Sequence, residues 1–362
     1  MEYLGKLHLA GLEVDQVAEA LAHEGWPRFR AEQVFRWLHQ KVVTNFTSMH
    51  NLPKPLINHL QEKYGSPLAC QIILQRESID GTIKYLFGLF DENTVEAVYI
   101  PEKDRGTLCV SVQVGCAMNC SFCATGRSGF VRNLSTAEIV SQVNAVRAAL
   151  PPERPRLSNI VFMGMGEPFA NFEAVMAAAA IFQSELGMHL GQRRITISTC
   201  GLVPEIRRFA DLKTQINLAV SLHAPDNDRR SSVMPINRRY PIEELLDACR
   251  YYTSRTNRRI SFEYALVEGF NDSHGDAQML AEILQDMLCH VNIIPVNPVE
   301  GFQRPEASRV QRFKQVLEAQ GIAASVRKER GTDIEAACGQ LRQVHGRTPS
   351  SRTERRMRSE SP

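Results

Sequence analysis

The sequence predicts an α/β fold: a partial (β/α)6 barrel preceded by a small N-terminal helical domain and a short β-hairpin linker. Three observations support this prediction. Apolar residues recur at helical spacing over residues 1–66, short alternating runs flank a turn within 67–104, and strand-like and helical stretches alternate along 105–341. Such alternation is typical of βα units around a parallel sheet. Residues 342–362 are rich in Arg, Ser, Glu and Pro without apolar periodicity, so a disordered basic tail is expected.

The N-terminal region predicts helices over 13–24, 31–40 and 53–64, with Pro-containing turns between them. This region mixes basic side chains with aromatic ones: Arg28, Arg30, Arg36 and Lys41 beside Trp26, Phe29 and Trp37. Such a mixture suits a nucleic-acid backbone with stacking bases. An ordinary amphipathic bundle with a solvated charged face has the same composition. Both an RNA-binding accessory domain and a plain bundle therefore stay open.

The next region switches to short alternating runs over 85–90 and 95–100, on either side of a turn at 91–93. A hairpin is the natural interpretation of this pattern. It would bring Glu96 onto a strand close to the start of the following domain.

The largest region alternates strands with helices. Strands are predicted over 108–114, 159–165, 194–198, 215–222, 259–267, 291–296 and 323–326, and helices over 136–149, 172–186, 204–209, 242–253, 276–287 and 305–320. Periodicity alone does not separate a partial barrel from a doubly wound sheet. The residues at the strand ends favour the partial barrel, because the functional side chains of a βα barrel lie at the carboxyl ends of its strands. Polar groups or glycines follow the strands at that end: Gly115, then residues 164–168, 198–201, 221–223 and 295–298.

Composition indicates a globular protein. Hydrophobic residues make up 43% and charged residues 23% of the 362 positions, without an apolar run of about 18 residues that would cross a membrane. The first residues lack a signal-peptide pattern, so a cytoplasmic protein is expected. A net charge of +2 does not by itself indicate a nucleic-acid partner. Nine cysteines, an odd number, argue against a disulfide framework and favour thiol or metal chemistry in a reducing compartment.

Three cysteines lie close together in the stretch Cys-Ala-Met-Asn-Cys-Ser-Phe-Cys. Cys116, Cys120 and Cys123 offer three thiolates, whereas a four-iron cluster is usually closed by four. No fourth ligand is near in the sequence, so one iron would stay open to a small molecule. A zinc site with a distant fourth ligand, and three unrelated core cysteines, are the alternatives. The open position makes catalysis the first hypothesis.

The strand ends carry groups suited to a polar ligand. Gly164 and Gly166 let the backbone approach a ligand closely, and the Glu167 carboxylate can accept from an ammonium group. Other strand ends offer hydroxyl, imidazole and amide groups for a ribose, a carboxylate or an adenine edge: Ser198, Ser221, His223 and Asn297. Taken singly, each of these could instead be a local turn or cap residue.

Five motifs become specific when they are taken together. They are Cys-Ala-Met-Asn-Cys-Ser-Phe-Cys-Ala-Thr-Gly at 116–126, Gly-Met-Gly-Glu-Pro at 164–168, Ser-Leu-His-Ala-Pro at 221–225, Met-Pro-Ile-Asn-Arg-Arg-Tyr at 234–240 and Arg-Gly-Thr-Asp-Ile-Glu-Ala-Ala-Cys-Gly-Gln at 330–340. This set resembles the RlmN family of radical S-adenosylmethionine (SAM) RNA adenine C2 methyltransferases, from the N-terminal helices to about Leu341. The related Cfr enzymes, which methylate C8 of the same adenosine, share most of the motifs. Their shorter N-terminal region and different flanking residues fit less well.

The resemblance implies a TIM-like radical-SAM barrel with two cofactors. A [4Fe–4S] cluster would be held by Cys116, Cys120 and Cys123. SAM would be bound by Gly166, Glu167, Ser198, Ser221, Leu222, His223 and Asn297. The implied substrates are C2 of adenosine 2503 in 23S rRNA and C2 of adenosine 37 in tRNA. The implied partners also include an external one-electron reductant such as flavodoxin, and the implied state is a monomer.

The family mechanism assigns three further residues. Adenine C2 is an electron-poor carbon bearing hydrogen, so a methyl cation transferred directly from SAM meets no nucleophile. The resemblance implies a ping-pong route in which one SAM methylates Cys338 and a radical from a second SAM removes hydrogen from that methyl group, which then adds to C2. Cys109 matches the residue that releases the product by forming a disulfide with Cys338, and Glu96 matches the proton acceptor. Without the resemblance, Cys109 would be a small core residue, Cys338 a helix end and Glu96 an exposed strand carboxylate.

RNA contacts are expected from the N-terminal helices and from basic side chains in or near the proposed active-site loops. These side chains are Arg127, Arg132, Arg229, Arg230, Arg238, Arg239, Arg327 and Lys328. Arginines in such loops also form ordinary ion pairs, so part of this set is expected to be structural. The cysteines outside the motifs are interpreted as packing residues, with Cys200 in doubt because it lies at a strand end: Cys70, Cys200, Cys249 and Cys289. The competing hypotheses are C8 methylation and a non-catalytic iron-sulfur protein that binds RNA.

Overall fold

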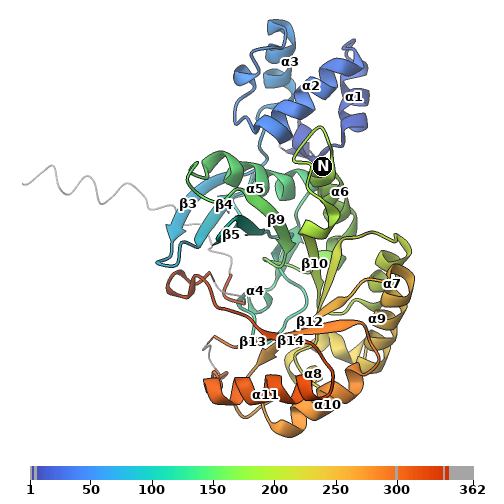
Figure 1. Cartoon of the computed structure of the whole chain (residues 1–362). Coiled ribbons are helices and arrows are strands. Elements are labelled where there is room, and N and C mark those ends of the chain that lie inside the picture. The colour runs from blue at the N-terminus through green and yellow to red at the C-terminus, as the bar shows by residue number, and fades with distance from the viewer. Residues whose placement is uncertain (1, 4–5, 298–300, 337–338, 342–362) are drawn as a thin grey trace, which may run out of the picture.

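One large sheet forms the centre of the molecule (Figure 1). The structure is a computed structural model that describes residues 2–3, 6–297, 301–336 and 339–341. The sheet has ten strands, and those from β6 through β9 to β14 run parallel in chain order. The bounds of the parallel strands are β6 Arg105–Cys109, β9 Leu157–Phe162, β10 Ile195–Thr199, β11 Asn217–Ser221, β12 Ile260–Leu266, β13 Cys289–Pro295 and β14 Ala324–Val326.

A helix connects each parallel strand to the next, on the outer side of the curved sheet (Figure 1). The helices are α5 Thr136–Ala149, α6 Phe172–Gln183, α7 Val203–Asp211, α9 Ile242–Thr256, α10 His274–Leu284 and α11 Ala307–Ala319. Their apolar faces and the strands share one hydrophobic core, which explains the apolar periodicity of the sequence. Capping boxes fix the first turns of α5 at Ser135 and of α10 at Ser273. The predicted partial (β/α)6 barrel is confirmed.

Three antiparallel strands continue the same sheet beyond β6. They are β3 Gln71–Glu77, β4 Ile83–Gly88 and β5 Thr94–Glu102. Strands β4 and β5 form the predicted hairpin, but β5 also pairs with β6, so the hairpin belongs to the main sheet. Nearly every residue of β3 is exposed, so this strand lacks the alternation that reveals a strand in a sequence.

The strand predicted over 108–114 is broken. Strand β6 ends at Cys109, and β7, Gln113–Gly115, pairs instead with β8, Phe130–Asn133, in a separate two-stranded sheet. The break follows from side-chain competition for the backbone, because the Ser111 N–H donates to the Gln142 side chain at 3.0 Å. The strand predicted over 108–114 would place Cys109 near its start, and this expectation is wrong. Cys109 lies at the carboxyl end of β6, which is the functional end of a parallel strand.

The N-terminal helices pack against α5 and α6 at one end of the sheet (Figure 1). Two bonds join this region to α5: the Arg147 guanidinium donates to the His39 carbonyl at 2.6 Å, and the Asn144 amide donates to the Leu38 carbonyl at 3.2 Å. The remaining helices and strands are β1 Glu2–Tyr3, β2 Lys6–Leu7, α1 Val14–Ala22, α2 Arg28–Arg36, α3 Lys54–Tyr64, α4 Ala124–Arg127 and α8 Asn227–Val233. Across the described ranges, no helix is both long and apolar enough to span a membrane.

Candidate active site

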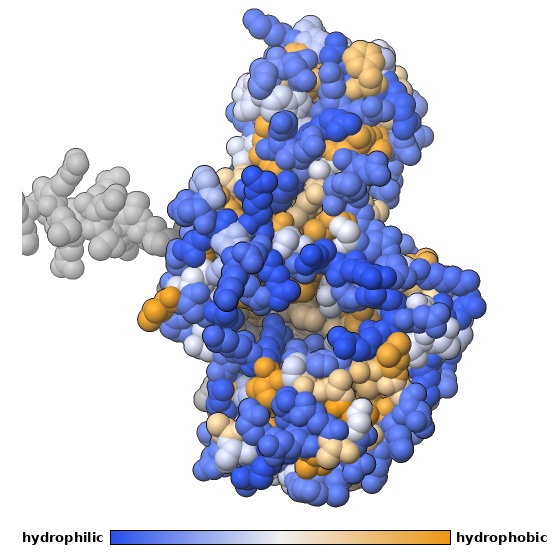
Figure 2. Space-filling view, in the orientation of Figure 1, coloured by the Kyte–Doolittle hydropathy of each residue, from blue (hydrophilic) through white to orange (hydrophobic). Residues whose placement is uncertain are grey.

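A cavity opens at the carboxyl ends of the parallel strands, where Figure 2 shows a hollow with a largely hydrophilic rim. Ten of the predicted site residues line it: Cys109, Cys116, Cys120, Cys123, Gly166, Glu167, Ser198, Ser221, His223 and Asn297. Two others, Leu222 and Glu96, are buried and do not line it. Cys338 lies outside the described residues. The structure thus brings together side chains that the sequence spreads over nearly 190 positions, from Cys109 to Asn297.

The cysteine loop connects β7 to α4 and presents free thiols to this cavity. The loop is fixed by backbone bonds, among them the Cys116 N–H to the Gly129 carbonyl at 2.8 Å and the Cys123 N–H to the Cys120 carbonyl at 3.2 Å. Burial raises the pKa of the Cys116 thiol to about 12, and it also raises the pKa of the Cys120 thiol. The charges of neighbouring thiolates raise both pKa values further. Thiolates crowded in this way need a positive partner, such as metal ions.

The donor set fits an iron-sulfur cluster better than a single ion. Within the part of the chain that the structure describes, no three His, Cys, Asp or Glu side chains are placed to hold one metal ion. A four-iron cluster makes a different demand, since each thiolate binds its own iron and the sulfurs stay apart. Cys116, Cys120 and Cys123 around one cavity satisfy that demand.

Glu167 is held toward the cavity by backbone donors. Its carboxylate accepts from the Cys200 N–H at 2.7 Å and from the Phe169 N–H at 3.0 Å. Burial nevertheless raises the pKa of this carboxyl above its usual range. Gly166 makes the turn possible, because its φ is 103° and a Cβ atom there would lie 2.5 Å from Gln113. A buried carboxylate with unused acceptor capacity is well suited to a cationic ligand group.

Arg230 on α8 holds two strand ends together and does not reach solvent. Its guanidinium donates to the carbonyls of Cys200 at 2.7 Å, Ser221 at 3.1 Å and Leu222 at 3.1 Å, and to the Asn237 side chain at 2.8 Å. Burial lowers its pKa to about 10, so the group stays charged at neutral pH. The prediction that Arg230 contacts RNA is wrong, because the side chain is fully buried under the strand ends.

His223 presents one defined donor. Its Nδ1 accepts from the Ala265 N–H at 2.9 Å, and burial together with Arg230 lowers its pKa to about 3. A neutral imidazole whose Nδ1 accepts must carry its proton on Nε2. The residue has a left-handed φ of 61°, and its carbonyl accepts from the Asn271 amide at 2.7 Å. The strand end of β11 is thus fixed in one conformation.

Two residues that line the cavity, Cys200 and Glu263, were not singled out as functional from the sequence. Cys200 was interpreted as packing, yet it lines the cavity beside Glu167. Glu263 lies within the apolar strand β12, where its carboxylate accepts from the Asn292 amide at 2.9 Å. Burial raises the pKa of Glu263, while the nearby Arg327 opposes the shift. An acidic residue inside an apolar strand was the available signal for Glu263. For Cys200 the signal was its place at a strand end.

The antiparallel strand β5 and the end of β6 form the other side of the cavity. Val98, Ile100 and Cys109 line it. Glu96 precedes Val98 by two positions on β5, so both side chains point to the same face of the sheet. The Glu96 side chain is 5% exposed and forms an ion pair with Lys84, Nζ to Oε1, at 3.1 Å. The interpretation of Glu96 as an exposed strand carboxylate is wrong.

The C-terminal segment also reaches the cavity. Ala336, Gly339 and Leu341 line it, on both sides of position 338. Two bonds connect this segment to the helix that follows the cysteine loop: the Ala124 N–H to the Gly339 carbonyl at 2.8 Å and the Thr125 hydroxyl to the Leu341 carbonyl at 2.5 Å. The segment and the cysteine loop are therefore neighbours.

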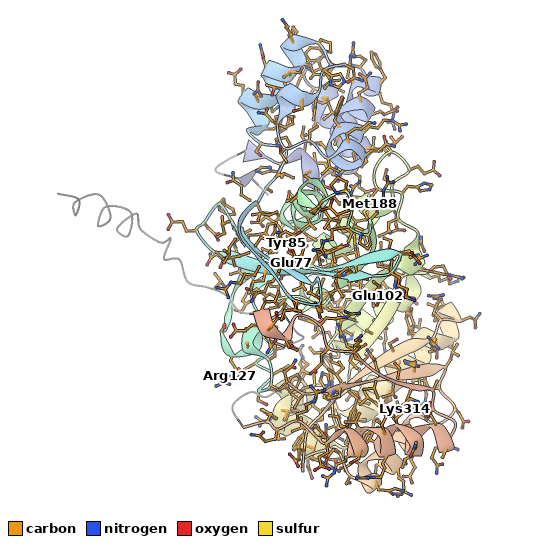
Figure 3. All side chains as sticks on the ribbon, turned by 60° about the vertical axis from the view of Figure 1, so that its left-hand side comes forward. Glu77, Tyr85, Glu102, Arg127, Met188 and Lys314 are labelled. Atoms are coloured by element: carbon orange, nitrogen blue, oxygen red, sulfur yellow. The ribbon has the colours of Figure 1, made fainter. Side chains whose placement is uncertain are left out.

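The basic side chains predicted to contact RNA fall into two groups. Four are exposed: Arg127, which projects from the surface in Figure 3, and Arg238, Arg239 and Lys328; Arg327 lines the cavity. Arg132 and Arg229 are instead held in ion pairs, Arg132 with Asp91 and Glu138 and Arg229 with Asp226 and Asp276. Their charges are balanced within the fold, which matches the ion-pair alternative that the sequence left open for part of this set.

Comparison with known families locates two matches. Residues 7–64 match the model described as "Ribosomal RNA large subunit methyltransferase N-terminal domain". Residues 110–280 match the model of the radical SAM superfamily, which spans the cysteine loop and the strand ends from β9 to β12.

Individual relatives match over almost the whole chain. The "Probable dual-specificity RNA methyltransferase RlmN" of Caldanaerobacter subterraneus subsp. tengcongensis is 48% identical over 342 residues, which cover 93% of this chain and 98% of that protein. The protein of the same name from Alkaliphilus oremlandii is 45% identical over 94% of this chain and 98% of its own. A crystal structure of a radical SAM methyltransferase from Sphaerobacter thermophilus superimposes with a TM-score of 0.90 at 49% identity, covering 93% of this chain and 99% of that one. The chain therefore belongs to the RlmN family of the radical SAM superfamily.

Proposed function

We propose that this protein methylates C2 of adenosine in 23S rRNA and in tRNA, through an S-methyl group carried by Cys338. Membership of the family implies a [4Fe–4S] cluster and SAM as cofactors. The relatives named as dual-specificity RNA methyltransferases support an RNA substrate. The observation that carries the proposal is that Cys109, the three cysteines of the loop and both described flanks of position 338 line one cavity.

The strand ends supply the binding groups for SAM. Glu167 would accept from the ammonium group, and the carboxylate of Glu167 is already oriented by two backbone donors. Ser198, Ser221, His223 and Asn297 would supply hydrogen bonds to the remaining polar edges, with His223 as a donor through Nε2. Leu222 does not line the cavity and would contribute only by shaping the strand end.

When bound, the reduced cluster and SAM supply the radical that removes one hydrogen atom from the S-methyl group of Cys338. The resulting carbon radical on Cys338 adds to adenine C2, and this addition links enzyme and RNA covalently. Glu96 then accepts the C2 proton. Cys109, as a thiolate, would form a disulfide with the Cys338 sulfur as the carbon-sulfur bond breaks. The methylene carbon left on C2 would gain a proton to become the methyl group, and the unpaired electron left by the radical addition would pass to the oxidised cluster. An external donor restores the two thiols and supplies the electron for the cluster.

RNA binding would use the exposed basic side chains around the cavity together with the N-terminal helices. Arg127, Arg238, Arg239 and Lys328 are exposed near the cysteine loop, α8 and β14. On α2, Phe29 is 52% exposed, and the guanidinium of Arg30 lies 4.6 Å from its ring centre. A base must leave its stack before its edge can enter the cavity, so phosphate contacts and base capture are both needed. We propose a cytoplasmic reaction on these RNA substrates, carried out by a monomer, since every group named belongs to one chain.

Reconstitution tests the proposal directly. The protein is loaded with iron and sulfide without oxygen, then given SAM, a reductant and an rRNA fragment, and the digested nucleosides are analysed by mass spectrometry. Formation of 2-methyladenosine supports the proposal. Formation of 8-methyladenosine would show instead that the enzyme methylates C8, as the Cfr enzymes do. The absence of both methyladenosine and 5′-deoxyadenosine would favour a non-catalytic RNA-binding protein.

Cys109→Ala tests the release step. Without the thiol that attacks the Cys338 sulfur, the covalent protein-RNA product should accumulate, seen as a band that nuclease removes. Cys200→Ala is the matched control, since it removes another thiol of the same cavity and should form no adduct. An adduct-free Cys109→Ala protein whose Cys338 still accepts a methyl group would remove Cys109 from the mechanism.

A further inference from the structure

We propose that Lys84 is a positioning residue for methyl transfer, holding the Glu96 carboxylate toward the cavity and joining it to the C-terminal segment 330–336. The inference rests on the proposed function, in which Glu96 accepts the C2 proton. Lys84 lies on β4, outside every motif that pointed to the family, and does not itself line the cavity.

The sheet register places Lys84 next to the reacting groups. Lys84 pairs with Val98 across β4 and β5, and Val98 pairs with Cys109 across β5 and β6. Residues directly opposite in antiparallel strands share a face, so Lys84, Val98 and Cys109 form one row on the cavity side. Glu96 is in the adjacent row, opposite Leu86. The ammonium thus reaches the carboxylate from a neighbouring row of the same face.

The Lys84 ammonium contacts two acceptors. It forms the ion pair with Glu96 at 3.1 Å and donates to the Glu335 carbonyl at 3.1 Å. The side chains of Lys84 and Glu96 are only 9% and 5% exposed. Neither charge would be tolerated alone at such burial, because removing one partner leaves the other uncompensated. The pair therefore fixes the orientation of the carboxylate, and Glu335 fixes the orientation of the pair.

Further bonds join the β3–β4 turn to the same segment. The Asp333 carboxylate accepts from the Ser78 hydroxyl at 2.5 Å and from the Ile79 N–H at 3.2 Å, and Asp80 accepts from the Gly331 N–H at 3.0 Å. The segment lies beside the turn and β4 in both ribbon views (Figures 1 and 3). We call the residues Ser78, Ile79, Asp80 and Lys84 the hairpin seat. Through its ion pair, Lys84 connects this seat to Glu96, a proposed catalytic residue.

The hairpin seat thus couples two parts of the proposed chemistry. The segment that it holds continues, three positions after Glu335, to the residue proposed to carry the methyl group. The same ammonium orients the carboxylate proposed to take the C2 proton. Correct docking of the segment and correct orientation of Glu96 therefore depend on one side chain. This explains why a lysine, with several donors on one nitrogen, occupies a buried position in the strand.

Lys84→Met tests this role in the full-length, cluster-loaded enzyme. The side chain keeps its apolar length and loses the ammonium. We expect cluster content and SAM binding to match the wild type and RNA methylation to fall at least about 100-fold, the usual contribution of an acid-base group. With RNA deuterated at C2, the variant should show a larger isotope effect than the wild type, and the protein-RNA adduct should accumulate. Arg76→Met is the matched control, because Arg76 is the exposed residue opposite Lys84 on β3.

Two further variants separate this role from loss of folding. Glu96→Gln combined with Lys84→Met removes both charges, and we expect its loss of rate to be smaller than the product of the two single losses, because residues that act as one unit are not additive. The loss that it shows beyond Glu96→Gln alone measures the contribution of Lys84 to docking of the segment. Lys84→Arg keeps the charge and should recover part of the rate. Wild-type methylation by Lys84→Met, or losses that multiply in the double variant, would overturn the inference while the proposed function stands. Wild-type methylation by Glu96→Gln would instead remove Glu96 from the proposed function, and the role of Lys84 with it.

Discussion

The two sides of the cavity are built differently. The strand-end wall, formed by Gly166, Glu167, Ser198, Ser221 and His223, is held by bonds among neighbouring strand ends. The antiparallel wall, formed by Val98, Ile100 and Cys109 with Glu96 behind them, is completed by a segment from the far end of the chain.

The difference separates the two tasks of a group-transfer enzyme. Cofactor binding benefits from groups fixed before the ligand arrives, because little conformational entropy is then lost on binding. The proposed covalent transfer to RNA needs a carrier that approaches the base and later leaves it. A wall completed by a separate segment suits that second task. Substitutions can disrupt both walls, one wall, or the connection between the two walls.

Cys120→Ala should have the largest effect, because the cysteine loop serves both walls. Loss of one of three thiolates should prevent stable cluster assembly and abolish methylation, as measured by iron and sulfide content and by the absorbance of the reconstituted protein. Cys249→Ala is the matched control: Cys249 is a fully buried cysteine on α9 that does not line the cavity. A full complement of iron in Cys120→Ala would contradict the assignment of the ligands.

Arg230→Met should damage the strand-end wall alone. The change leaves the carbonyls of Cys200, Ser221 and Leu222 without their buried donor, at about 1–3 kcal/mol for each unsatisfied group. We expect a lower melting temperature and an affinity for SAM reduced about tenfold, equivalent to about 1.4 kcal/mol. At saturating SAM, the Cys109→Ala background should still trap the adduct. Arg239→Met, at an exposed position, should leave SAM affinity unchanged, and an equal loss in both variants would contradict the role of Arg230.

The same contrast explains what could be predicted from the sequence. The strand-end wall was largely predictable, since Glu167, Ser221 and His223 follow apolar strands within short motifs, and strand ends meet at one edge of a parallel sheet. The antiparallel wall could not be predicted from the sequence. Lys84 and its acceptor at Glu335 are 251 residues apart, and no local pattern connects them. Cys109 was assigned only through the family resemblance, and the break in its strand depends on a glutamine from α5.

Two adjacent arginines show the same limit of prediction from the sequence. Arg229 and Arg230 are adjacent in the sequence, yet one forms ion pairs near the surface and the other is fully enclosed. Their separation follows from the short helix α8, which points successive side chains in different directions. Charge and loop position alone predicted RNA contacts for both.

Ser111→Ala should have the smallest effect, because it breaks only the connection between the walls. The Ser111 hydroxyl donates to the Glu96 carbonyl at 2.6 Å and accepts from the Met165 N–H at 2.9 Å, so it joins β5 to the glycine-rich strand end. Ser141→Ala is the matched control: Ser141 is equally buried and accepts from the Ala69 N–H at 2.8 Å, away from both walls. Each variant should lose about 1–3 kcal/mol of unfolding free energy. Only Ser111→Ala should also slow methylation, by about fivefold to tenfold, since a displacement of Glu96 relative to the strand end alters the reacting geometry. Equal methylation rates in the two variants would mean that the walls act independently, and that the hairpin seat alone positions Glu96.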